Sequence, residues 1–377
     1  MTQRHLHIVA HDIPWPPDYG GVIDLFYKLK ALHAQGVLIQ LHCFTQGRPQ
    51  QEELNKYCTS VKYYKREKNI FSLSFRLPFI VKSRKSRQLM NDLEKDNYPV
   101  LLEGIHCTFH LFTGELDNRK VFVRLHNIEF KYYLQLAKNE PRFLKKWYFL
   151  NESMLLRKYE RLIANKAVFI AVNKLDATLY KSLFNLHHVH YLPVFIPYTL
   201  SICKSGMGCF CLYHGNLSIN ENEKAVTWLL QNVFHEIDIP LVIAGKDPSK
   251  KMMSIVHTHP NTCIVANPTE KEMQDLLGKA QVNILPSFNN TGVKLKLINA
   301  IFNGRHCIVN EQGAAGSGIE SACHIATDAV SFCKLIHQLY LTEFTEQERE
   351  CRNGLLQRLY NNDKNAITLA TIIFGDN

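Results

Sequence analysis

The stretch from Val282 to Gly304 constrains the fold of this chain more strongly than any other. A short apolar run over 282–285 ends at Pro286, and a segment rich in Ser, Asn, Thr and Gly follows. Beyond it, apolar residues recur at the spacing of one buried helix face: Val293, Leu297, Ala300 and Ile301. Gly304 is a suitable stop for that helix. The pattern predicts a buried strand, a polar glycine loop and a helix, which is the repeating unit of α/β folds.

The loop in this unit can bind an anion. A helix start offers free backbone N–H groups and the positive end of the helix dipole, and Lys294 and Lys296 add charge to the predicted first turn. A diphosphate fits this environment best and would meet the chain at Thr291, Gly292, Val293 and Lys294. The alternative is an ordinary strand–helix loop with two solvated lysines.

Composition sets wide limits on the function. With 377 residues, 46% of them apolar, the chain can form two domains with separate cores. No apolar run approaches the ~18–20 residues of a membrane span, and residues 1–11 turn directly into a strand pattern without an export signal. The 11 cysteines lack metal or disulfide spacing, so we expect a cytoplasmic protein. The net charge of +10 favours an anionic partner.

Strand and helix patterns alternate along the whole chain. In the first half the predicted strands are 5–10, 37–44, 98–105, 120–125 and 167–172, with helices at 22–35 and 143–164. In the second half they are 207–213, 241–244, 263–266, 282–285 and 306–309, with helices at 220–231 and 363–374. This alternation predicts parallel sheets covered on both faces. The two prolines in 192–197 indicate a linker, so we expect domains at 1–194 and 195–360, and a terminal helix in 361–377 that returns to the first domain.

Three polar positions of the first domain follow predicted strands. Gly20-Gly21 lies after the first strand and before a helix, where glycine lets the backbone approach a ligand closely. His126 follows the strand at 120–125 and can hydrogen-bond a sugar or phosphate. Glu103 ends another strand and is either structural or an acceptor contact. The alternatives are a sharp turn at the glycine pair and a structural histidine at 126.

Residues 62–87 form a basic segment interleaved with aromatic residues. It can lie on an anionic membrane surface or contact a lipid-linked acceptor. It could also bind nucleic acid by stacking and charge. The third interpretation is a solvated face with a few core aromatic residues. No helix-turn-helix, zinc or stacking-sheet signature accompanies the charge, so we expect no nucleic-acid partner.

In order and spacing, the motifs of this chain resemble those of the GT-B glycosyltransferases, in particular the retaining group 1 family (family 4). The matches are Gly20-Gly21, the run His214-Gly215-Asn216-Leu217-Ser218, the run Ala244-Gly245-Lys246-Asp247, Pro286-Ser287, and Gly313 with Gly316-Ser317-Gly318. The resemblance implies two Rossmann-like parallel-sheet domains that face one another across a cleft. It also implies transfer of a sugar from a nucleotide-diphosphate sugar, UDP- or GDP-linked, with retention and without a metal or other cofactor.

The resemblance places the donor on the second domain and the acceptor on the first. The donor residues would be Gly215, Asn216, Gly245, Lys246, Thr291, Gly292, Val293, Lys294, Lys296 and Asn299. The acceptor side would include Gly20, Gly21, Glu103 and His126, with His126 and Lys294 as catalytic residues. The acceptor would be a glycan or a lipid-linked glycan in cell-envelope polysaccharide synthesis, which places the protein at the inner face of the membrane.

Two motifs depart from the family pattern. The two positions of the usual Glu-x7-Glu motif are Thr291 and Asn299 in this chain. The family often has an Arg and a Lys that face the diphosphate; this chain has Asn216 at the first position and only Asn222, Glu223 and Lys224 near the second. Lys294 and Lys296 can supply the missing charge, and Asn299 can still bond a ribose diol. The alternative function is a catalytically degenerate GT-B homologue that binds a glycan, a nucleotide or a partner protein.

Overall fold

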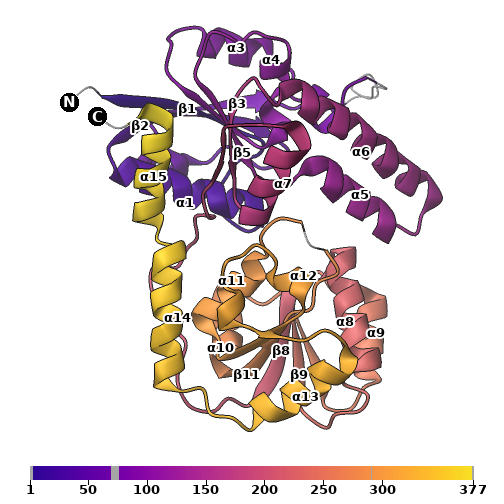
Figure 1. Ribbon diagram of the computed structural model, residues 1–377. Coiled ribbons are helices and arrows are strands. Elements are labelled where there is room, and N and C mark those ends of the chain that lie inside the picture. Colours follow the sequence, from indigo (N-terminus) through magenta and orange to yellow (C-terminus); the bar gives the residue numbers. More distant parts are fainter. Residues whose placement is uncertain (1–2, 69–75, 290, 376–377) are drawn as a thin grey trace. The chain divides into compact units, whose positions relative to one another are not determined.

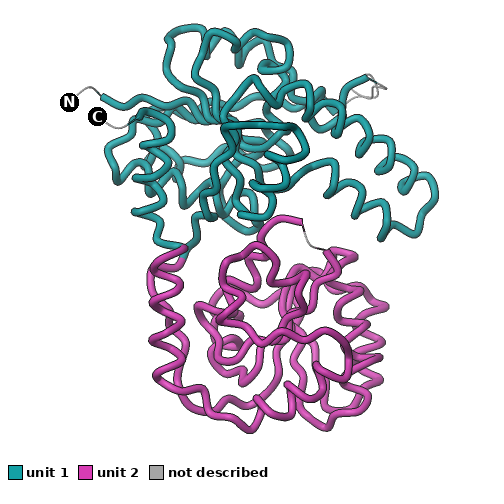
Figure 2. Tube along the Cα trace, viewed as in Figure 1, with its two compact units in different colours: residues 1–197, 360–377 teal, residues 198–359 magenta. Residues whose placement is uncertain are grey.

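The chain divides into two compact units. A computed structural model describes residues 3–68, 76–289 and 291–375. The first unit takes in residues 1–197 and 360–377 of the chain, and the second takes in residues 198–359 (Figure 2). The domain ends expected at 194 and 360 therefore lie near those of the units, and the terminal helix belongs to the first unit.

The first unit is built on a parallel sheet. The described residues form seven strands in the order β3-β2-β1-β4-β5-β6-β7 (Figure 1). Their bounds are β1 (Arg4–Ala10), β2 (Val37–Thr45), β3 (Ser60–Lys65), β4 (Val100–Glu103), β5 (Val121–Leu125), β6 (Val168–Ala171) and β7 (Val189–Tyr191). All residues of β4 and β5 are buried, as expected for central parallel strands covered on both faces.

Helices complete two apolar cores in this unit. They are α1 (Gly20–Ala34), α2 (Phe79–Lys82), α3 (Arg87–Leu93), α4 (Phe109–Phe112), α5 (Glu129–Asn139), α6 (Phe143–Ile163), α7 (Lys174–Phe184) and α15 (Asn362–Phe374), with short 3-10 turns η1 (Glu52–Lys56) and η3 (Ile105–Cys107). One core holds Leu25 and Leu29 of α1 together with Leu369 of α15. The other holds residues of α6 and α7, among them Leu156 and Tyr180.

The second unit repeats this architecture with a smaller sheet. Its described strands run in the order β10-β9-β8-β11-β12-β13. The bounds are β8 (Phe210–Asn216), β9 (Leu241–Lys246), β10 (Thr262–Ala266), β11 (Ala280–Ile284), β12 (His306–Val309) and β13 (His324–Ile325). The helices are α8 (Asn220–Asn232), α9 (Lys250–His257), α10 (Glu270–Lys279), α11 (Leu295–Asn303), α12 (Glu311–Ala314), α13 (Ala329–Tyr340) and α14 (Glu346–Leu359), with a 3-10 turn η4 (Glu320–Ala322).

Each sheet reverses its strand order once. The reversal lies between β1 and β4 in the first unit and between β8 and β11 in the second. Open α/β sheets bind ligands beyond the carboxyl ends of the strands at such a switch point. We therefore expect ligand sites beyond the carboxyl ends of β1 and β4 in the first unit and of β8 and β11 in the second.

Two helix starts differ from the sequence prediction. Helix α11 begins at Leu295, and Lys294 is its extended N-cap residue, because Gly292 takes a φ of +63° and breaks the helical course before it. Val293 therefore precedes the helix instead of lying on its buried face. Helix α1 begins at Gly20, so the glycine pair forms its first turn and does not precede it.

No helix in the described ranges combines the length and the apolar character that crossing a bilayer requires.

The close approach of β8 and β9 leaves no room for a side chain at Gly245. A Cβ at this position would lie 1.8 Å from the carbonyl oxygen of Gly215 on the neighbouring strand. We predict that Gly245→Ala lowers the free energy of unfolding by about 2–3 kcal/mol, because the backbone must shift to admit the methyl group. Urea denaturation measures this loss.

Gly278 of α10 is the matched control, since a Cβ there meets no atom within 4 Å. Gly278→Ala should leave stability equal or raise it by up to about 1 kcal/mol, because alanine favours the helix. Equal losses in the two variants would contradict the steric argument.

Candidate functional site

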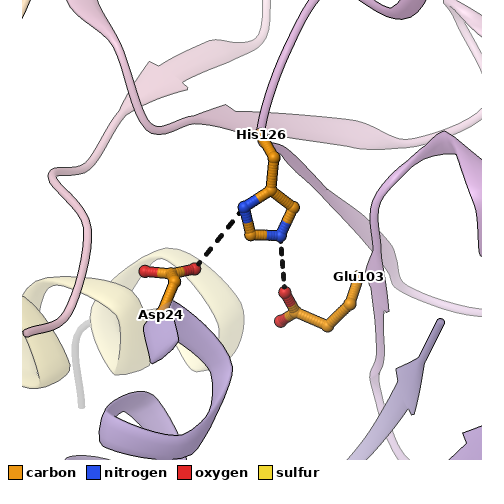
Figure 3. Close-up of side chains that lie close together, drawn as sticks. All are labelled: Asp24, Glu103 and His126. Atoms are coloured by element: carbon orange, nitrogen blue, oxygen red, sulfur yellow. Dashed lines mark hydrogen bonds and ion pairs between the residues drawn. The ribbon is translucent and has the colours of Figure 1, made fainter. Parts of the chain in front are cut away.

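A buried histidine–carboxylate cluster lies at the switch point of the first unit. His126 follows β5, Glu103 ends β4, and Asp24 projects from α1 (Figure 3). The Nε2 atom of His126 lies 3.2 Å from Oε2 of Glu103, and its Nδ1 atom lies 4.0 Å from Oδ2 of Asp24. Both acids are fully buried, whereas the imidazole is 16% exposed. The structure thus brings together two residues that the sequence indicated and one, Asp24, that it did not.

Two buried cations balance the two carboxylates. The Nζ atom of Lys28 donates to Glu103 at 2.6 Å and to Asp24 at 3.0 Å. Arg124 donates to both oxygens of Asp24, at 3.1 and 3.2 Å. Burial opposes ionisation of the acids, but the charges of Arg124 and Lys28 outweigh it and hold the pKa of Asp24 well below its usual range. Burial is likewise outweighed at Glu103, where Lys28 and His126 lower the pKa.

The network also fixes the chain that leaves the first sheet. Arg124 donates to the carbonyl oxygens of Leu192 and Pro193, both at 2.8 Å. The backbone N–H of Phe195 donates to Asp24 at 2.8 Å. The segment expected to link the domains is therefore held against α1 and β5 by side chains of the same cluster.

Two further histidines lie beside this cluster. The ring centroid of His11 lies 5.3 Å from that of His106 and 6.2 Å from that of His126. Burial and the nearby Arg84 lower the pKa of His11 to about 3, and the same two effects hold the pKa of His106 well below its usual value. Both imidazoles are therefore neutral near pH 7, and each keeps a buried Nδ1 atom that bonds no group in the described residues.

Gly21 makes room for this histidine row. A Cβ on Gly21 would lie 3.0 Å from Cε1 of His11, so a larger residue would press on the ring. Gly20, Gly21, Glu103 and His126, predicted for the acceptor side, thus gather near the carboxyl ends of β1, β4 and β5. Sequence reasoning missed His11 and His106, although each follows a predicted strand.

Asp24, Glu103 and His126 have the composition of a metal site. In the described part of the chain they form a group whose ligand atoms all lie within 4.8 Å of one another. Lys28 and Arg124 already neutralise both carboxylates and would repel a divalent cation. The arrangement therefore fits an ion-pair network better than a metal centre, and metal independence stays a prediction.

In the second unit, Lys296 lies between the ends of two structural elements. Its Nζ atom donates to Oδ1 of Asn222, in the first turn of α8, at 2.8 Å and to the hydroxyl of Tyr213, on β8, at 3.1 Å. The amine also lies 4.9 Å from the centroid of the Tyr213 ring. Burial lowers the pKa of Lys296 to about 8, partly offset by the charge of Glu221.

The β8 and β9 ends carry four of the predicted donor residues. Gly215 pairs with Gly245, and Asn216 pairs with Lys246, across the two strands. The Oδ1 atom of Asn216 accepts hydrogen bonds from the backbone N–H and the hydroxyl of Ser218. The backbone carbonyl oxygen of Asn216 accepts from the side-chain amide of Asn222. Asn216 is thus linked to Lys296 by way of Asn222, and a Cβ on Gly215 would lie 3.7 Å from Cδ of Lys296.

The loop before α11 is held by its own side chains. The Oδ1 atom of Asn289 accepts from the backbone N–H and the hydroxyl of Thr291, each at 2.8 Å. Glu221 accepts from Ser287 at 2.7 Å and from Asn289 at 3.3 Å. Lys294 donates to the carbonyl of Thr291 at 2.8 Å. The N–H of Thr291 is therefore satisfied within the protein, contrary to the expectation that this backbone group is free for a phosphate.

Asn299, expected at the ribose, is surrounded by donors of the second unit. Its Oδ1 atom accepts from Asn303 at 2.6 Å, from Tyr198 at 2.7 Å and from Gln274 at 3.4 Å. Its carbonyl oxygen is therefore fully engaged, which leaves the amide N–H groups as the part of the side chain that a diol could meet.

The described part of the basic segment 62–87 is divided between the protein interior and the surface. Arg84 is buried and donates to the carbonyls of Ile80 and His11. Lys62 pairs with Asp92 at 2.7 Å. Residues 69–75 lie outside the described ranges. Five other basic residues are exposed: Lys65, Lys68, Arg76, Lys85 and Arg87. Contact of this segment with an anionic membrane surface therefore stays a prediction.

A cavity of about 740 Å³ lies at the carboxyl ends of β2 and β3. It is lined by Thr45, Gln46, Gly47, Lys65, Arg66, Glu67 and Lys68. Three of these side chains are cationic and one is anionic, so an anionic group would be favoured there.

Comparison with known proteins agrees with this architecture. Residues 209–341 match the family model described as "Glycosyl transferases group 1". An uncharacterised 44.6 kDa protein in the cps region of Klebsiella pneumoniae is 29% identical over 355 residues, which cover 87% of this chain and 89% of that protein. The second unit of this protein thus matches the group 1 glycosyl transferases, which supports a transferase enzyme.

Solved structures share the fold at low sequence identity. A TarM mutant of S. aureus in complex with UDP and other ligands has a TM-score of 0.67 at 9% identity, covering 99% of this chain and all of that one. HepE of Anabaena in complex with UDP and glucose has a TM-score of 0.66 at 10% identity, and the match covers 97% of this chain and 98% of that one. The lipopolysaccharide outer core galactosyltransferase WaaB has a TM-score of 0.63 at 14% identity, and the match covers 98% of this chain and 99% of that one. These likenesses establish the GT-B fold of this chain.

The buried network gives a stability prediction. Asp24→Asn keeps the shape of the side chain but removes the carboxylate that Arg124 bonds to and leaves Lys28 with Glu103 alone. We expect the free energy of unfolding to fall by about 3–5 kcal/mol, because a buried charge loses its partner. Chemical denaturation followed by circular dichroism measures the loss.

The exposed pair of Asp275 and Lys279, 2.7 Å apart on α10, supplies the control. Asp275→Asn should leave stability unchanged, since solvent screens that pair. A similar result for both variants would contradict the role given to the buried network.

Proposed function

We propose that this glycosyltransferase moves a sugar from a nucleotide-diphosphate sugar, UDP- or GDP-linked, to a glycan or lipid-linked acceptor. The proposal includes retention of anomeric configuration and a place in cell-envelope polysaccharide synthesis. The observation that carries the donor assignment is the position of the Lys296 amine at the carboxyl end of β8, beside the first turn of α8.

The amine of Lys296 is suited to replace a missing family cation. Group 1 enzymes often face the donor diphosphate with an Arg and a Lys after the first strand of the second domain, where this chain has Asn216 and Asn222. The amine lies 2.8 Å from the side-chain oxygen of Asn222. A positive charge thus reaches the same corner from α11 instead of α8. Asn222 and Tyr213 hold it in place, so little reorganisation is needed when a ligand binds.

This position matches the charge that develops in the reaction. The anomeric carbon loses its bond to the β-phosphate oxygen and gains one to the acceptor hydroxyl, so the diphosphate leaves with added negative charge. A fixed cation near that oxygen lowers the barrier because the attraction grows as the bond breaks. Lys294, which is bonded to the Thr291 carbonyl, is a secondary source of charge.

The histidine row is suited to an acceptor sugar. Glu103 fixes the ring of His126, and the neutral imidazoles of His11 and His106 can each both donate and accept hydrogen bonds. Sugar hydroxyls need this mixture of donors and acceptors. The basic cavity at the β2 and β3 ends would suit an anionic group of a larger acceptor.

Similar proteins support the choice of substrates. Structures of TarM and HepE contain UDP, and the TarM complex also contains α-GlcNAc-glycerol. WaaB is named as a galactosyltransferase of the lipopolysaccharide outer core. A relative encoded in a cps region agrees with a role in the cell envelope.

Removing the Lys296 charge tests the donor site. At about 100 times its dissociation constant, a bound nucleotide stabilises the folded protein by roughly 2.7 kcal/mol. We predict that the thermal shift produced by the best of UDP, GDP, ADP and CDP disappears in Lys296→Met. The apo protein should remain folded, as judged by circular dichroism.

Lys279→Met removes the same charge from an exposed position of α10 and should keep the full thermal shift. An unchanged shift in Lys296→Met would place the nucleotide elsewhere. Turnover of a nucleotide sugar by the wild-type protein is the separate test of catalysis, and nucleotide binding without any turnover would favour the degenerate homologue.

Lys296 also predicts a pH dependence. Its pKa of about 8 in the free protein means that the amine is mostly charged at pH 7 and neutral well above pH 8. A bound diphosphate raises that pKa, so nucleotide affinity should be level below about pH 8 and then fall by about tenfold per unit. Titration calorimetry between about pH 7 and pH 9 measures the trend.

Lys296→Arg stays charged throughout this range, and its affinity should vary little with pH. If the wild-type and arginine proteins showed the same decline above pH 8, the decline would not come from Lys296.

A further inference from the structure

The outward face of α6 is largely apolar. Phe143, Trp147 and Met154 are 78%, 58% and 61% exposed, and Leu150 lies between the last two. These four residues follow one another at intervals of three or four, so they lie along one side of the helix. Leu144, at the same end, is 81% exposed. Contiguous exposed apolar surface of this kind marks an interaction site in a folded protein.

The charges of α6 are sorted between its two sides. Each exposed charged side chain on the helix is basic: Lys145, Lys146, Arg157, Lys158 and Arg161. The two acids, Glu152 and Glu160, are buried and accept hydrogen bonds from the backbone N–H groups of Phe79 and Phe130. Lys145 and Lys146 lie in the first turn and the other three in the last two turns, so basic residues flank the apolar stripe towards both ends of the helix.

The opposite side of α6 is already committed to the core. Leu156, Tyr159 and Ile163 belong to the apolar core of the first unit. Figure 1 shows α5 and α6 side by side, joined by a turn at the end of the pair farthest from the sheet. Phe143 and Leu144 begin α6 at that turn, so the most exposed apolar side chains lie at the tip of the hairpin.

We propose that α6 docks this protein on the surface of an anionic lipid bilayer. The helix would lie in the interface, with Phe143, Trp147 and Met154 among the acyl chains and the basic residues against lipid headgroups. An interfacial helix needs this pairing of an apolar stripe with flanking Lys and Arg. A bilayer is favoured over a protein partner because its negative surface complements a face that presents cations and no acid.

This site differs from the one expected in residues 62–87. In the described part of that segment, cations such as Lys65, Lys68 and Arg87 are exposed, but no exposed large apolar side chain accompanies them. Its aromatic residues there are buried or half-buried, as Tyr64 and Phe79 are. On α6 the cations and the apolar residues share one accessible side. The lipid-binding element is thus the long helix, whose outward face the sequence pattern alone had not separated from its packing face.

Vesicle flotation tests this proposal with the full-length protein. Vesicles of phosphatidylcholine with about 30% phosphatidylglycerol should carry the wild type at about 0.15 M salt, whereas pure phosphatidylcholine should carry much less. Phe143→Ser with Trp147→Ser should weaken partitioning roughly tenfold or more. Lys146→Gln with Lys158→Gln should weaken it to a similar degree on the anionic vesicles.

Two matched pairs in the second unit control for generic effects. Val330→Ser with Leu341→Ser removes apolar side chains that are 78% and 80% exposed. Lys250→Gln with Lys251→Gln removes two exposed cations from α9. Both control variants should float like the wild type. Circular dichroism should show the native helix content in all four variants, because each changed side chain is exposed.

The position of Trp147 gives a direct readout. Lipids brominated on their acyl chains should quench its fluorescence in a protein whose other tryptophans, Trp15 and Trp228, are changed to Phe. Failure of the wild type to float on anionic vesicles would overturn the proposal, as would equal flotation of the α6 variants and the wild type. Loss of a dimer in Phe143→Ser with Trp147→Ser, without any vesicle binding by the wild type, would assign the face to a second copy of the chain instead.

Discussion

The carboxylate of Asp24 is the contact on which the first unit depends. It lies on α1 but bonds to Lys28 one turn away, to Arg124 on β5 and to the backbone N–H of Phe195. A fully buried charge is costly, and the cost is offset here because each oxygen has charged or N–H donors. Since Arg124 also donates to the carbonyls of Leu192 and Pro193, one acid positions the helix, the central strand and the chain that leads to the second unit.

The same network shapes the surface where a ligand would bind. Glu103 is shared between Lys28 and His126, so the buried ion pairs and the accessible imidazole belong to one system. The arrangement separates two tasks. The fully buried groups carry the charges, while the lowered pKa values of His11 and His106 keep both imidazoles neutral, so they can meet a polar, uncharged ligand such as a sugar.

In the second unit, the amine of Lys296 lies far along the chain from the residues that it contacts. Lys296 comes from α11, but its amine reaches Asn222 on α8 and Tyr213 on β8. Compared with the family motif, the sequence lacks the two cations expected at Asn216 and near Asn222. The fold places a cation beside them, because the long lysine side chain spans the space between neighbouring helix starts.

The sequence by itself determined the architecture of this protein. Apolar runs alternating with helical patterns predicted two parallel-sheet units, and they placed α6, α8 and α15 within one or two residues of their observed bounds. This succeeded because strand and helix periodicity record local burial. The starts of α1 and α11 were less well predicted, since the packing of Gly21 against His11 and the turn at Gly292 depend on three-dimensional contacts.

Tertiary structure alone decided which polar residues act together. Glu103 and His126 could be singled out as residues near strand ends, but Asp24, Lys28 and Arg124 were hidden in apolar patterns where charge is unexpected. Their distances depend on which strands are neighbours, and the order β1-β4-β5 brings together groups separated by about a hundred residues of chain. Likewise, only packing separated the inward acids of α6 from its outward cations, because burial belongs to the folded surface and not to the order of residues.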